Sequence, residues 1–245
     1  QKVRLLPASP TFLNLFLISG VPSRYDLSSL RFITYGTEPM PQSLLKRIKE
    51  AFPKAKLIQT FGTSETGISQ TSSQSSTSTL IKFDDPNTEY KIVDGELWLR
   101  SKSQILGYLN HEMSRFTEDG WFKTGDLLEP ASQEEGENYF RIVGRKQEII
   151  NVGGEKVTPS EVESTLLEIP EINDCLVYAE SNAITGQIVA AEIVLKANCD
   201  PKTLKRAIKN YCRSKLSAYK IPVKIYFKEA TNISSRYKKM RLKES

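Results

Sequence analysis

The sequence predicts an α/β domain with an antiparallel addition, followed by a smaller α+β domain. Strand-like and helix-like segments alternate in the first part of the chain, as in parallel sheets covered by helices. The turn dipeptide Asp94-Gly95 then lies between two segments of alternating polarity, which indicates an antiparallel hairpin. From residue 144 onward, strands and amphipathic helices are mixed. A chain of 245 residues has room for this arrangement of two domains.

Residues 1–79 are predicted to be an α/β region with a parallel sheet. Residues 31–35 form a short apolar run that ends at a glycine, which predicts a strand. The segment 41–52 begins with proline and carries apolar residues at helical spacing, so a helix is expected there. Residues 56–61 are the next expected strand, and the Ser-, Thr- and Gln-rich residues 71–79 indicate a loop.

Residues 80–143 are predicted to form an antiparallel, β-barrel-like subdomain. The segments on either side of Asp94-Gly95 alternate in polarity, which places Leu97 and Leu99 on one face of a strand.

The remaining part, residues 144–245, is predicted to be an α+β domain. The segment TPSE, from Thr158 to Glu161, has the spacing of a capping box with proline at the first helical position, and predicts a helix through Leu167. A second helix is expected from Asp200-Pro201 to Lys215. The expected strands are 175–179, 188–195 and 223–227.

Composition and charge exclude several classes of protein. With 39% hydrophobic and 26% charged residues, and no apolar run of about 20 residues, no transmembrane segment is expected and a cytoplasmic location is predicted. The net charge of +5 is concentrated in the last fifteen residues, which carry five basic side chains and one acidic one. Because a nucleic-acid surface spreads its charge over a face, no nucleic-acid partner is predicted.

Cysteine and histidine usage excludes further chemistry. Cys175, Cys199 and Cys212 are odd in number and lack CxxC spacing, which argues against a disulfide framework or a structural zinc site and favours reduced thiols. The only histidine, His111, lies in a polar stretch and is expected at the surface, so Ser-His-Asp hydrolysis is not expected. The chain opens with Gln1 rather than methionine, which suggests that it begins within a longer protein.

Four glycine-bearing loops carry groups that suit a nucleotide. They are YGTEPM (35–40), FGTSETG (61–67), GWFKTGDL (120–127) and GRKQEIINVGGEKVTPSEVE (144–163). In the second loop an aromatic ring could lie against a base, two hydroxyls could bind phosphate and Glu65 could hold a divalent cation. In the third, Asp126 could accept the ribose hydroxyls, and in the fourth Arg145 offers a donor fork. Each loop alone is equally well explained as an ordinary turn.

These four loops, the segment GELWLRSKSQILGYLN (95–110) between the second and the third, and a tail with Lys238 followed three residues on by Arg241 form an ordered set. This set resembles the adenylate-forming superfamily. That family includes acyl-CoA synthetases, adenylation domains that load carrier proteins, and beetle luciferases. The resemblance spans essentially the whole chain, but only the carboxyl-terminal half of the family's sequence. It therefore implies that residues 1–79 are part of a large α/β nucleotide-binding domain, and that a small lid domain follows and rotates about a hinge at Gln147. The family's phosphate loop belongs to the missing amino-terminal half, and residues 70–82 contain no glycine to replace it.

The resemblance also implies roles for individual residues. Lys238 matches the catalytic lysine and Glu65 the acid that helps to hold Mg²⁺. Asp126 and Arg145 would share the ribose hydroxyls, while Gly153 and Gly154 would border the pantetheine channel. The implied ligand-binding residues are Gly36, Thr37, Glu38, Phe61, Gly62, Thr63, Ser64, Asp126, Arg145, Gly153 and Gly154.

Several positions depart from the family pattern. Phe61 replaces a tyrosine, Ser64 replaces a threonine, and Gln147 stands where Asp, Lys or Ser is commoner. In the tail, Tyr237 replaces the glycine before the lysine, so Lys239 is an alternative catalytic lysine. The tail could also be only a solvated basic segment, or a weaker phosphate-binding patch for RNA or lipid.

The function that the resemblance implies is that of an ATP-dependent, AMP-forming acid ligase of the acyl-CoA synthetase type. Its cofactors would be ATP or AMP, Mg²⁺, and CoA or phosphopantetheine, and its partners a carboxylic acid, an acyl acceptor and the missing amino-terminal half of the enzyme. Two alternatives remain open: an adenylation enzyme that loads a carrier protein, and a non-catalytic module that binds a nucleotide or an acyl group. Without the phosphate loop, the isolated chain is expected to be inactive.

Overall fold

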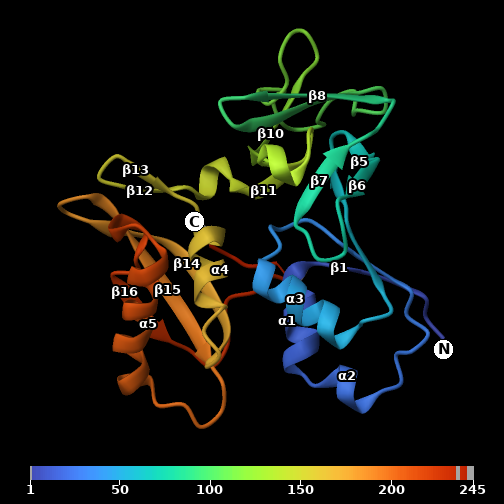
Figure 1. The fold of residues 1–245 in the computed structure, drawn as a ribbon. Coiled ribbons are helices and arrows are strands. Elements are labelled where there is room, and N and C mark those ends of the chain that lie inside the picture. Colours follow the sequence, from blue (N-terminus) through green and yellow to red (C-terminus); the bar gives the residue numbers. More distant parts are fainter. Residues whose placement is uncertain (1, 236–237, 242–245) are drawn as a thin grey trace. The chain divides into compact units, whose positions relative to one another are not determined.

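The computed structural model describes residues 2–235 and 238–241, which fall into two compact units (Figure 1). The first unit is built from Gln1–Pro10, Asp26–Met40 and Ile48–Gln147. The second is built from Thr11–Tyr25, Pro41–Arg47 and Glu148–Ser245. The chain passes for the last time from the first unit to the second between Gln147 and Glu148.

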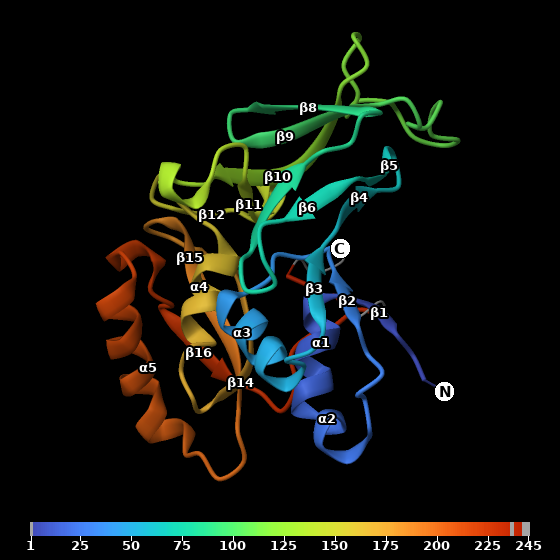
Figure 2. The same ribbon diagram turned by 45° about the vertical axis from the view of Figure 1, so that its right-hand side comes forward.

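Three parallel strands, β1 (Leu5–Ala8), β2 (Phe32–Tyr35) and β3 (Lys56–Gln59), lie side by side in that order in the first unit (Figure 2). The helix α3 (Gln42–Ala51) connects β2 to β3, and it runs where the apolar spacing predicts a helix. Its inward side chains Leu44, Leu45 and Ile48 are fully or almost fully buried. Parallel strands joined through a helix are the α/β arrangement expected from the sequence.

A six-stranded sheet follows in the first unit, in the order β6-β7-β11-β10-β9-β8. The hairpin between β8 and β9 turns at Asp94 and Gly95, whose φ angles of 51° and 79° are those a two-residue primed turn requires. Leu97 and Leu99 on β9 are completely buried, as their alternation predicts. The strands are β6 (Thr71–Ser73), β7 (Leu80–Phe83), β8 (Thr88–Val93), β9 (Glu96–Ser101), β10 (Phe122–Pro130) and β11 (Phe140–Arg145).

The prediction of a loop over 71–79 is wrong for its first three residues. Thr71, Ser72 and Ser73 form β6, which pairs antiparallel with β7 at the edge of the sheet. Composition indicated a loop because Ser is a turn former, but an edge strand needs only a partner for its backbone groups. That partner lies elsewhere in the chain, where local composition cannot reveal it.

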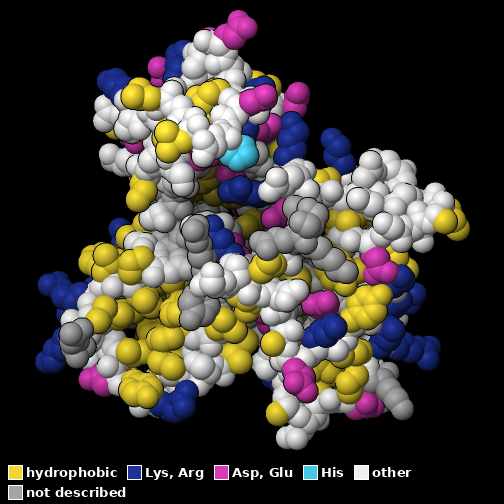
Figure 3. All heavy atoms as spheres, turned by 180° about the vertical axis from the view of Figure 1, so that it is seen from behind, with side chains coloured by type: hydrophobic (Ala, Val, Ile, Leu, Met, Phe, Trp, Pro, Cys, Tyr) yellow, Lys and Arg dark blue, Asp and Glu magenta, His cyan; other side chains and the backbone are white. Residues whose placement is uncertain are grey.

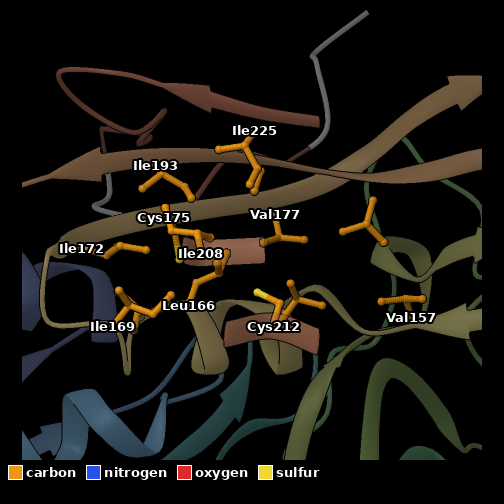
Figure 4. Close-up of a cluster of buried hydrophobic side chains, with 14 of the residues drawn as sticks. Val157, Leu166, Ile169, Ile172, Cys175, Val177, Ile193, Ile208, Cys212 and Ile225 are labelled. Carbon is orange, nitrogen blue, oxygen red and sulfur yellow. The ribbon is translucent and has the colours of Figure 1, made fainter. Parts of the chain in front are cut away.

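The second unit has an α+β fold with its own hydrophobic core (Figure 4). Apolar side chains from β14 and β15 pack against those of the helices α4 and α5, among them Val177, Ile193, Leu166 and Ile208. The elements are α1 (Pro10–Ile18), α2 (Val21–Arg24), β12 (Ile150–Val152), β13 (Glu155–Val157), α4 (Pro159–Leu166), β14 (Ile172–Asn182), β15 (Gly186–Leu195), α5 (Pro201–Lys215) and β16 (Lys224–Phe227). The sheet order is β13-β12-β15-β14, with β16 parallel to β15.

The capping box predicted at the start of α4 does not form. Pro159 opens the helix as expected, but the Thr158 side chain makes no capping hydrogen bond. The Glu161 carboxylate instead accepts two hydrogen bonds from the Lys220 ammonium, at 2.6 and 2.8 Å. A cation from a distant part of the chain therefore outcompetes the local backbone amide.

Two expectations about single residues agree with the structure. All three cysteines are free thiols, and Cys175 and Cys212 are buried. His111 is exposed, and Figure 3 shows the histidine side chain at the surface. Among the described helices, none is both long and apolar enough to cross a lipid bilayer.

Candidate active site

Asp126 and Arg145 are brought together on neighbouring strands of the first unit. They are direct register partners on β10 and β11, and the Arg145 Nε lies 3.2 Å from an Asp126 carboxylate oxygen. The Asp126 side chain is 10% exposed and that of Arg145 is 42% exposed. A carboxylate held by a guanidinium at the surface of a sheet can accept hydroxyl groups while the cation faces solvent. The pair therefore suits the ribose-binding role that the sequence suggests.

Glu65 lies at the tip of a short hairpin formed by β4 (Phe61–Thr63) and β5 (Gly67–Ser69). Its Oε1 accepts a hydrogen bond of 2.8 Å from the Tyr108 hydroxyl and lies 3.9 Å from an Arg115 guanidinium nitrogen. No contact of Glu65 with Tyr108 or Arg115 was expected, because both residues lie in a later loop and Tyr108 is 43 positions away along the chain.

The hydroxyl groups of the same hairpin differ in what they can offer a phosphate. Thr63 Oγ1 accepts a hydrogen bond from the Thr66 amide and shares another with the Thr66 hydroxyl, so it is used inside the turn. Ser64 is exposed at the tip. Of the two predicted phosphate donors, Ser64 is therefore the better placed.

Phe61 is a core residue. Its side chain is only 8% exposed and its ring packs edge-on against Phe83, in a cluster that includes Leu97 and Leu99. Stacking on a base needs an open ring face, so the expectation that Phe61 lies against a base has no support in this packing. The neighbouring Gly62 is exposed.

The loop after β2 is shaped by close backbone approach. A Cβ on Gly36 would lie 2.5 Å from the Thr60 carbonyl oxygen, so only glycine fits there. The next residue, Thr37, is exposed and has a φ of 72°, a conformation that is strained for a side chain with a branched Cβ. Glu38 is partly exposed beside it. Strained residues of this kind cluster at ligand sites, which is compatible with the nucleotide-contacting role expected for this loop.

Gly153 and Gly154 form the turn between β12 and β13. Their φ angles of 61° and 98° require residues without a side chain, and both are exposed. The Gly154 amide donates to the Asn151 side chain at 2.9 Å and the Gly153 amide to the Thr185 carbonyl at 3.0 Å. The turn geometry thus explains the glycine pair without reference to a channel. Gln147 is exposed in a short 3₁₀ turn, Lys146–Glu148, at the passage between the units.

The described part of the basic tail is folded. Residues 232–234 and 238–240 pair antiparallel: Ile233 and Lys239 form a bridge, and the Met240 amide donates to the Asn232 carbonyl. The Ser234 amide donates to the Lys238 carbonyl at 2.9 Å, which fixes the backbone of Lys238. Arg236, Tyr237 and Lys243 lie outside the described residues. The idea that the tail is only a solvated segment is therefore wrong for its described part.

Lys239 and Arg241 of the tail form ion pairs with buried acidic side chains of the second unit. Glu163 on α4 is buried, and its Oε2 lies 2.7 Å from Arg241 Nη2 and 3.5 Å from Lys239 Nζ. Its Oε1 accepts the Val177 amide at 2.9 Å. Asp174, also buried, lies 3.5 Å from the Lys239 ammonium. Lys239 is thus held inside the protein by two carboxylates.

Burial and charge act in opposite directions on this cluster. Burial by itself would raise the pKa of Glu163, but the Arg241 and Lys239 cations and the Val177 amide outweigh it, so the pKa is lowered. Burial would likewise lower the pKa of Lys239, but Glu163 and Asp174 outweigh it and raise the pKa. Glu163 and Lys239 therefore both stay charged over the neutral pH range.

These contacts distinguish the two candidate lysines. The Lys239 side chain is 9% exposed and is ion-paired, whereas Lys238 is partly exposed. A catalytic lysine has to reach a ligand, so Lys238 fits that role better than Lys239. The sequence analysis missed Glu163 and Asp174. A signal for Glu163 did exist, because it lies between Val162 and Leu166 on the apolar side of α4.

The residues around Glu65 fit Mg²⁺ as a single carboxylate ligand. Among the described residues, no group of three or more acidic, histidine or cysteine side chains is gathered as a metal site. Mg²⁺ is commonly held by one or two carboxylates together with phosphate and water oxygens, so one glutamate is sufficient. The hydrogen bond from Tyr108 would orient that carboxylate.

Two family models match this chain, one in each part. The model of the AMP-binding enzyme family matches residues 1–109, and that of the AMP-binding enzyme C-terminal domain matches residues 161–235. The chain belongs to the adenylate-forming, AMP-binding enzyme family.

Individual relatives of the adenylate-forming family are similar along most of the chain. The 4-coumarate--CoA ligase-like 2 of Arabidopsis thaliana is 31% identical over 229 residues, which are 84% of this chain and 39% of that protein. Acyl-CoA synthetase 7 of Caenorhabditis elegans is 29% identical over 233 residues, covering 89% and 42%. The crystal structure of the anthranilate CoA ligase AuaEII with anthranoyl-AMP has a TM-score of 0.81 at 28% identity and covers 96% and 48%. The chain thus spans less than half the length of these relatives.

The tail contacts lead to a first prediction. Lys239→Met should lower the free energy of unfolding of the second unit by about 3–5 kcal/mol, because it leaves Glu163 and Asp174 buried with less compensating charge. Lys238→Met, the matched control, should change it by less than about 0.5 kcal/mol. Hydrogen exchange of β14 amides measures the second unit, whereas fluorescence of Trp98 and Trp121 measures the first. Equal effects of the two substitutions on β14 exchange would contradict the assignment.

The pKa of Glu163 predicts how the cluster responds to acid. Because folding lowers that pKa below its usual 4.5, the stabilisation is present above pH 4.5 and is lost as the pH falls through the lowered value. The stability difference between the native chain and Glu163→Gln should therefore be large at pH 7 and shrink below pH 4.5. Denaturant unfolding followed by far-UV circular dichroism at several pH values measures it. Glu155→Gln, on the exposed face of β13, is the control, and a difference for Glu163→Gln that does not change with pH would refute the prediction.

Proposed function

We propose that this chain is the carboxyl-terminal half of an ATP-dependent, AMP-forming acid ligase of the acyl-CoA synthetase type. The observation that carries the proposal is that both family models match in order along one chain. The activity would join a carboxylic acid to AMP with release of pyrophosphate, and then transfer the acyl group to a thiol. The amino-terminal half, with its phosphate loop, would complete the enzyme; the relatives' greater length supports this part of the proposal.

The proposed reaction gives a role to each of the cations and carboxylates described above. An acid carboxylate and a phosphate repel each other, so a positioned lysine is needed where they meet, and Lys238 would supply that charge. Asp126 and Arg145 would hold the ribose hydroxyls. Glu65 would hold Mg²⁺, which supplies further positive charge at the phosphates. The buried pairs of Lys239 and Arg241 support the role of Lys238, because they anchor the segment that carries it.

The second half-reaction would use the same chain after a rotation of the second unit. Gln147 would be the hinge, with residues 1–79 and 80–143 forming the fixed part and 144–245 the lid. Gly153 and Gly154 would then border the path of the pantetheine thiol. The exposure of Gln147 at the passage between the units supports this hinge position.

CoA is the proposed acceptor, because the relatives compared above are named as CoA ligases or acyl-CoA synthetases. A carrier protein bearing phosphopantetheine is the alternative acceptor. The proposed location is the cytoplasm, which the three free thiols support. A role in fatty acid metabolism fits the acyl-CoA synthetase type, but the acid itself is not assigned.

The activity is tested by ATP–pyrophosphate exchange on the protein together with its amino-terminal half, with panels of fatty and aryl acids. Exchange that depends on one class of acid, followed by acyl transfer to CoA, is the expected result. Transfer to a phosphopantetheinyl carrier instead of CoA would favour the carrier-loading enzyme. The isolated chain is expected to bind AMP weakly without turnover. A protein that binds AMP but shows no exchange with any acid in the complete form would be a binding module, and the proposal would fail.

The role of Lys238 is tested by separating the two half-reactions. Lys238→Ala in the complete enzyme should lower the rate of acyl-AMP formation by about 100-fold or more, because the charge at the phosphate is lost. The same variant should transfer the acyl group from pre-made acyl-AMP to the thiol at nearly the native rate. Rapid-quench measurement of each half-reaction gives both numbers. Lys209→Ala, on α5, is a lysine control, and equal loss in both half-reactions would assign Lys238 another role.

A further inference from the structure

A buried carboxylate next to the Asp126–Arg145 pair has no role in the function proposed so far. Glu96 begins β9, and its side chain is only 7% exposed. Its Oε1 accepts the Gly125 amide at 3.0 Å, and its Oε2 lies 2.9 Å from the Lys146 ammonium. A buried carboxylate is costly unless both oxygens are bonded, and here both are.

The two partners of Glu96 are chain neighbours of the two proposed ribose-binding residues. Gly125 immediately precedes Asp126, and Lys146 immediately follows Arg145. Since Asp126 and Arg145 are themselves ion-paired, the five residues form a closed ring of interactions through three adjacent strands. Glu96 therefore restrains both members of the pair through their neighbours.

The strand that carries Asp126 needs such a restraint. The pairing of β10 with β9 is regular at Lys123 but shifts register before Leu127, so residues 124–126 lie in an irregular stretch of the ladder. In this stretch, hydrogen bonds to side chains take the place of the backbone hydrogen bonds of a regular ladder. The Thr124 hydroxyl donates to the Leu97 carbonyl at 2.7 Å and accepts the Asp126 amide at 3.0 Å, while Glu96 takes the Gly125 amide.

The electrostatics of the ring agree with its geometry. The Lys146 ammonium is largely exposed, yet its hydrogen bond and its charge interaction with Glu96 raise its pKa. Lys146 therefore remains charged and continues to balance the buried carboxylate.

We propose that Glu96 is a positioning residue of the nucleotide site, which sets the place of Asp126 relative to Arg145 so that both reach the ribose hydroxyls. It acts through the Gly125 amide and the Lys146 ammonium and touches no ligand itself. The inference rests on the proposed function, because Glu96 can position ribose-binding residues only if Asp126 and Arg145 do bind a ribose.

The test compares ATP with 2′,3′-dideoxy-ATP, which lacks both hydroxyls that the pair would bind. In the complete enzyme, Glu96→Gln should lower kcat/KM for ATP about tenfold, because a small displacement of a binding group is enough to lose its contacts. The same substitution should lower kcat/KM for the dideoxy nucleotide by less than about twofold. Acid-dependent release of pyrophosphate measures both. Glu89→Gln is the matched control, because it removes the carboxylate of another ion pair in the same sheet, with Arg100.

Two further variants keep the outcome decisive. Lys146→Met alters an exposed side chain and should reduce the preference for ATP about threefold, even where Glu96→Gln does not fold. Asp126→Asn should reduce the preference at least as much as Glu96→Gln. An equal fall with both nucleotides in the Glu96 and Lys146 variants would make Glu96 merely structural and overturn the inference. If Asp126→Asn leaves the preference intact, the ribose assignment fails and the inference fails with it, whereas acid-dependent exchange by the native enzyme would still support the proposed ligase.

Discussion

The buried carboxylate of Glu163 is the constraint on which the second unit's functional end depends. A buried carboxylate is stable only when cations or hydrogen-bond donors contact its oxygens. The Val177 amide donates to one oxygen of Glu163. The other oxygen is paired with Arg241 and Lys239, which lie near the carboxyl-terminal end of the chain. Such a cluster adds little net stability compared with well-packed apolar residues, but it penalises every arrangement that leaves the acid unpaired. Its main effect is therefore to select one register for the tail.

That register determines which lysine faces outward. Lys239 and Arg241 are two positions apart, and side chains with this spacing lie on the same face of an extended segment. Both reach Glu163, so the adjacent Lys238 belongs to the opposite face. A slip by one residue would bury Lys238 and expose Lys239, and Asp174 opposes that slip because it too is paired with the Lys239 ammonium. The same logic holds in the first unit, where Glu96 fixes the neighbours of Asp126 and Arg145.

Features that depend on neighbouring residues could be predicted from the sequence. The Asp94-Gly95 hairpin, the burial of Leu97 and Leu99 and the helix over 201–215 follow from turn chemistry and periodicity, and the structure contains each of them. Where the predictions failed, a distant partner was decisive. Glu161 bonds Lys220 instead of capping its own helix, and the serine-rich residues 71–73 become a strand because β7 lies beside them.

The candidate site divides in the same way. Motif order located Asp126, Arg145, Glu65 and Lys238, because those positions follow one another in a fixed sequence. Tyr108, Glu96 and Glu163 also lie inside the motifs, but no role was expected for them, because their contacts are with residues 29 to 78 positions away. Phe61 shows the converse, because an aromatic ring in a suggestive motif is buried and packs against Phe83. A motif thus marks positions, whereas the contacts between those positions are seen only in the folded chain.

The charge of the tail has a different meaning once these contacts are known. The sequence shows a cluster of cations that would repel one another and attract any polyanion. In the folded chain, Lys239 is balanced by Glu163 and Asp174, and Arg241 by Glu163 and Glu148. The cations that remain to act outward are therefore fewer than the sequence suggests, which weakens the case for a broad nucleic-acid or lipid surface. Among the described tail residues, Lys238 is partly exposed next to the ion-paired Lys239, and this position suits a task that needs one charge in one place.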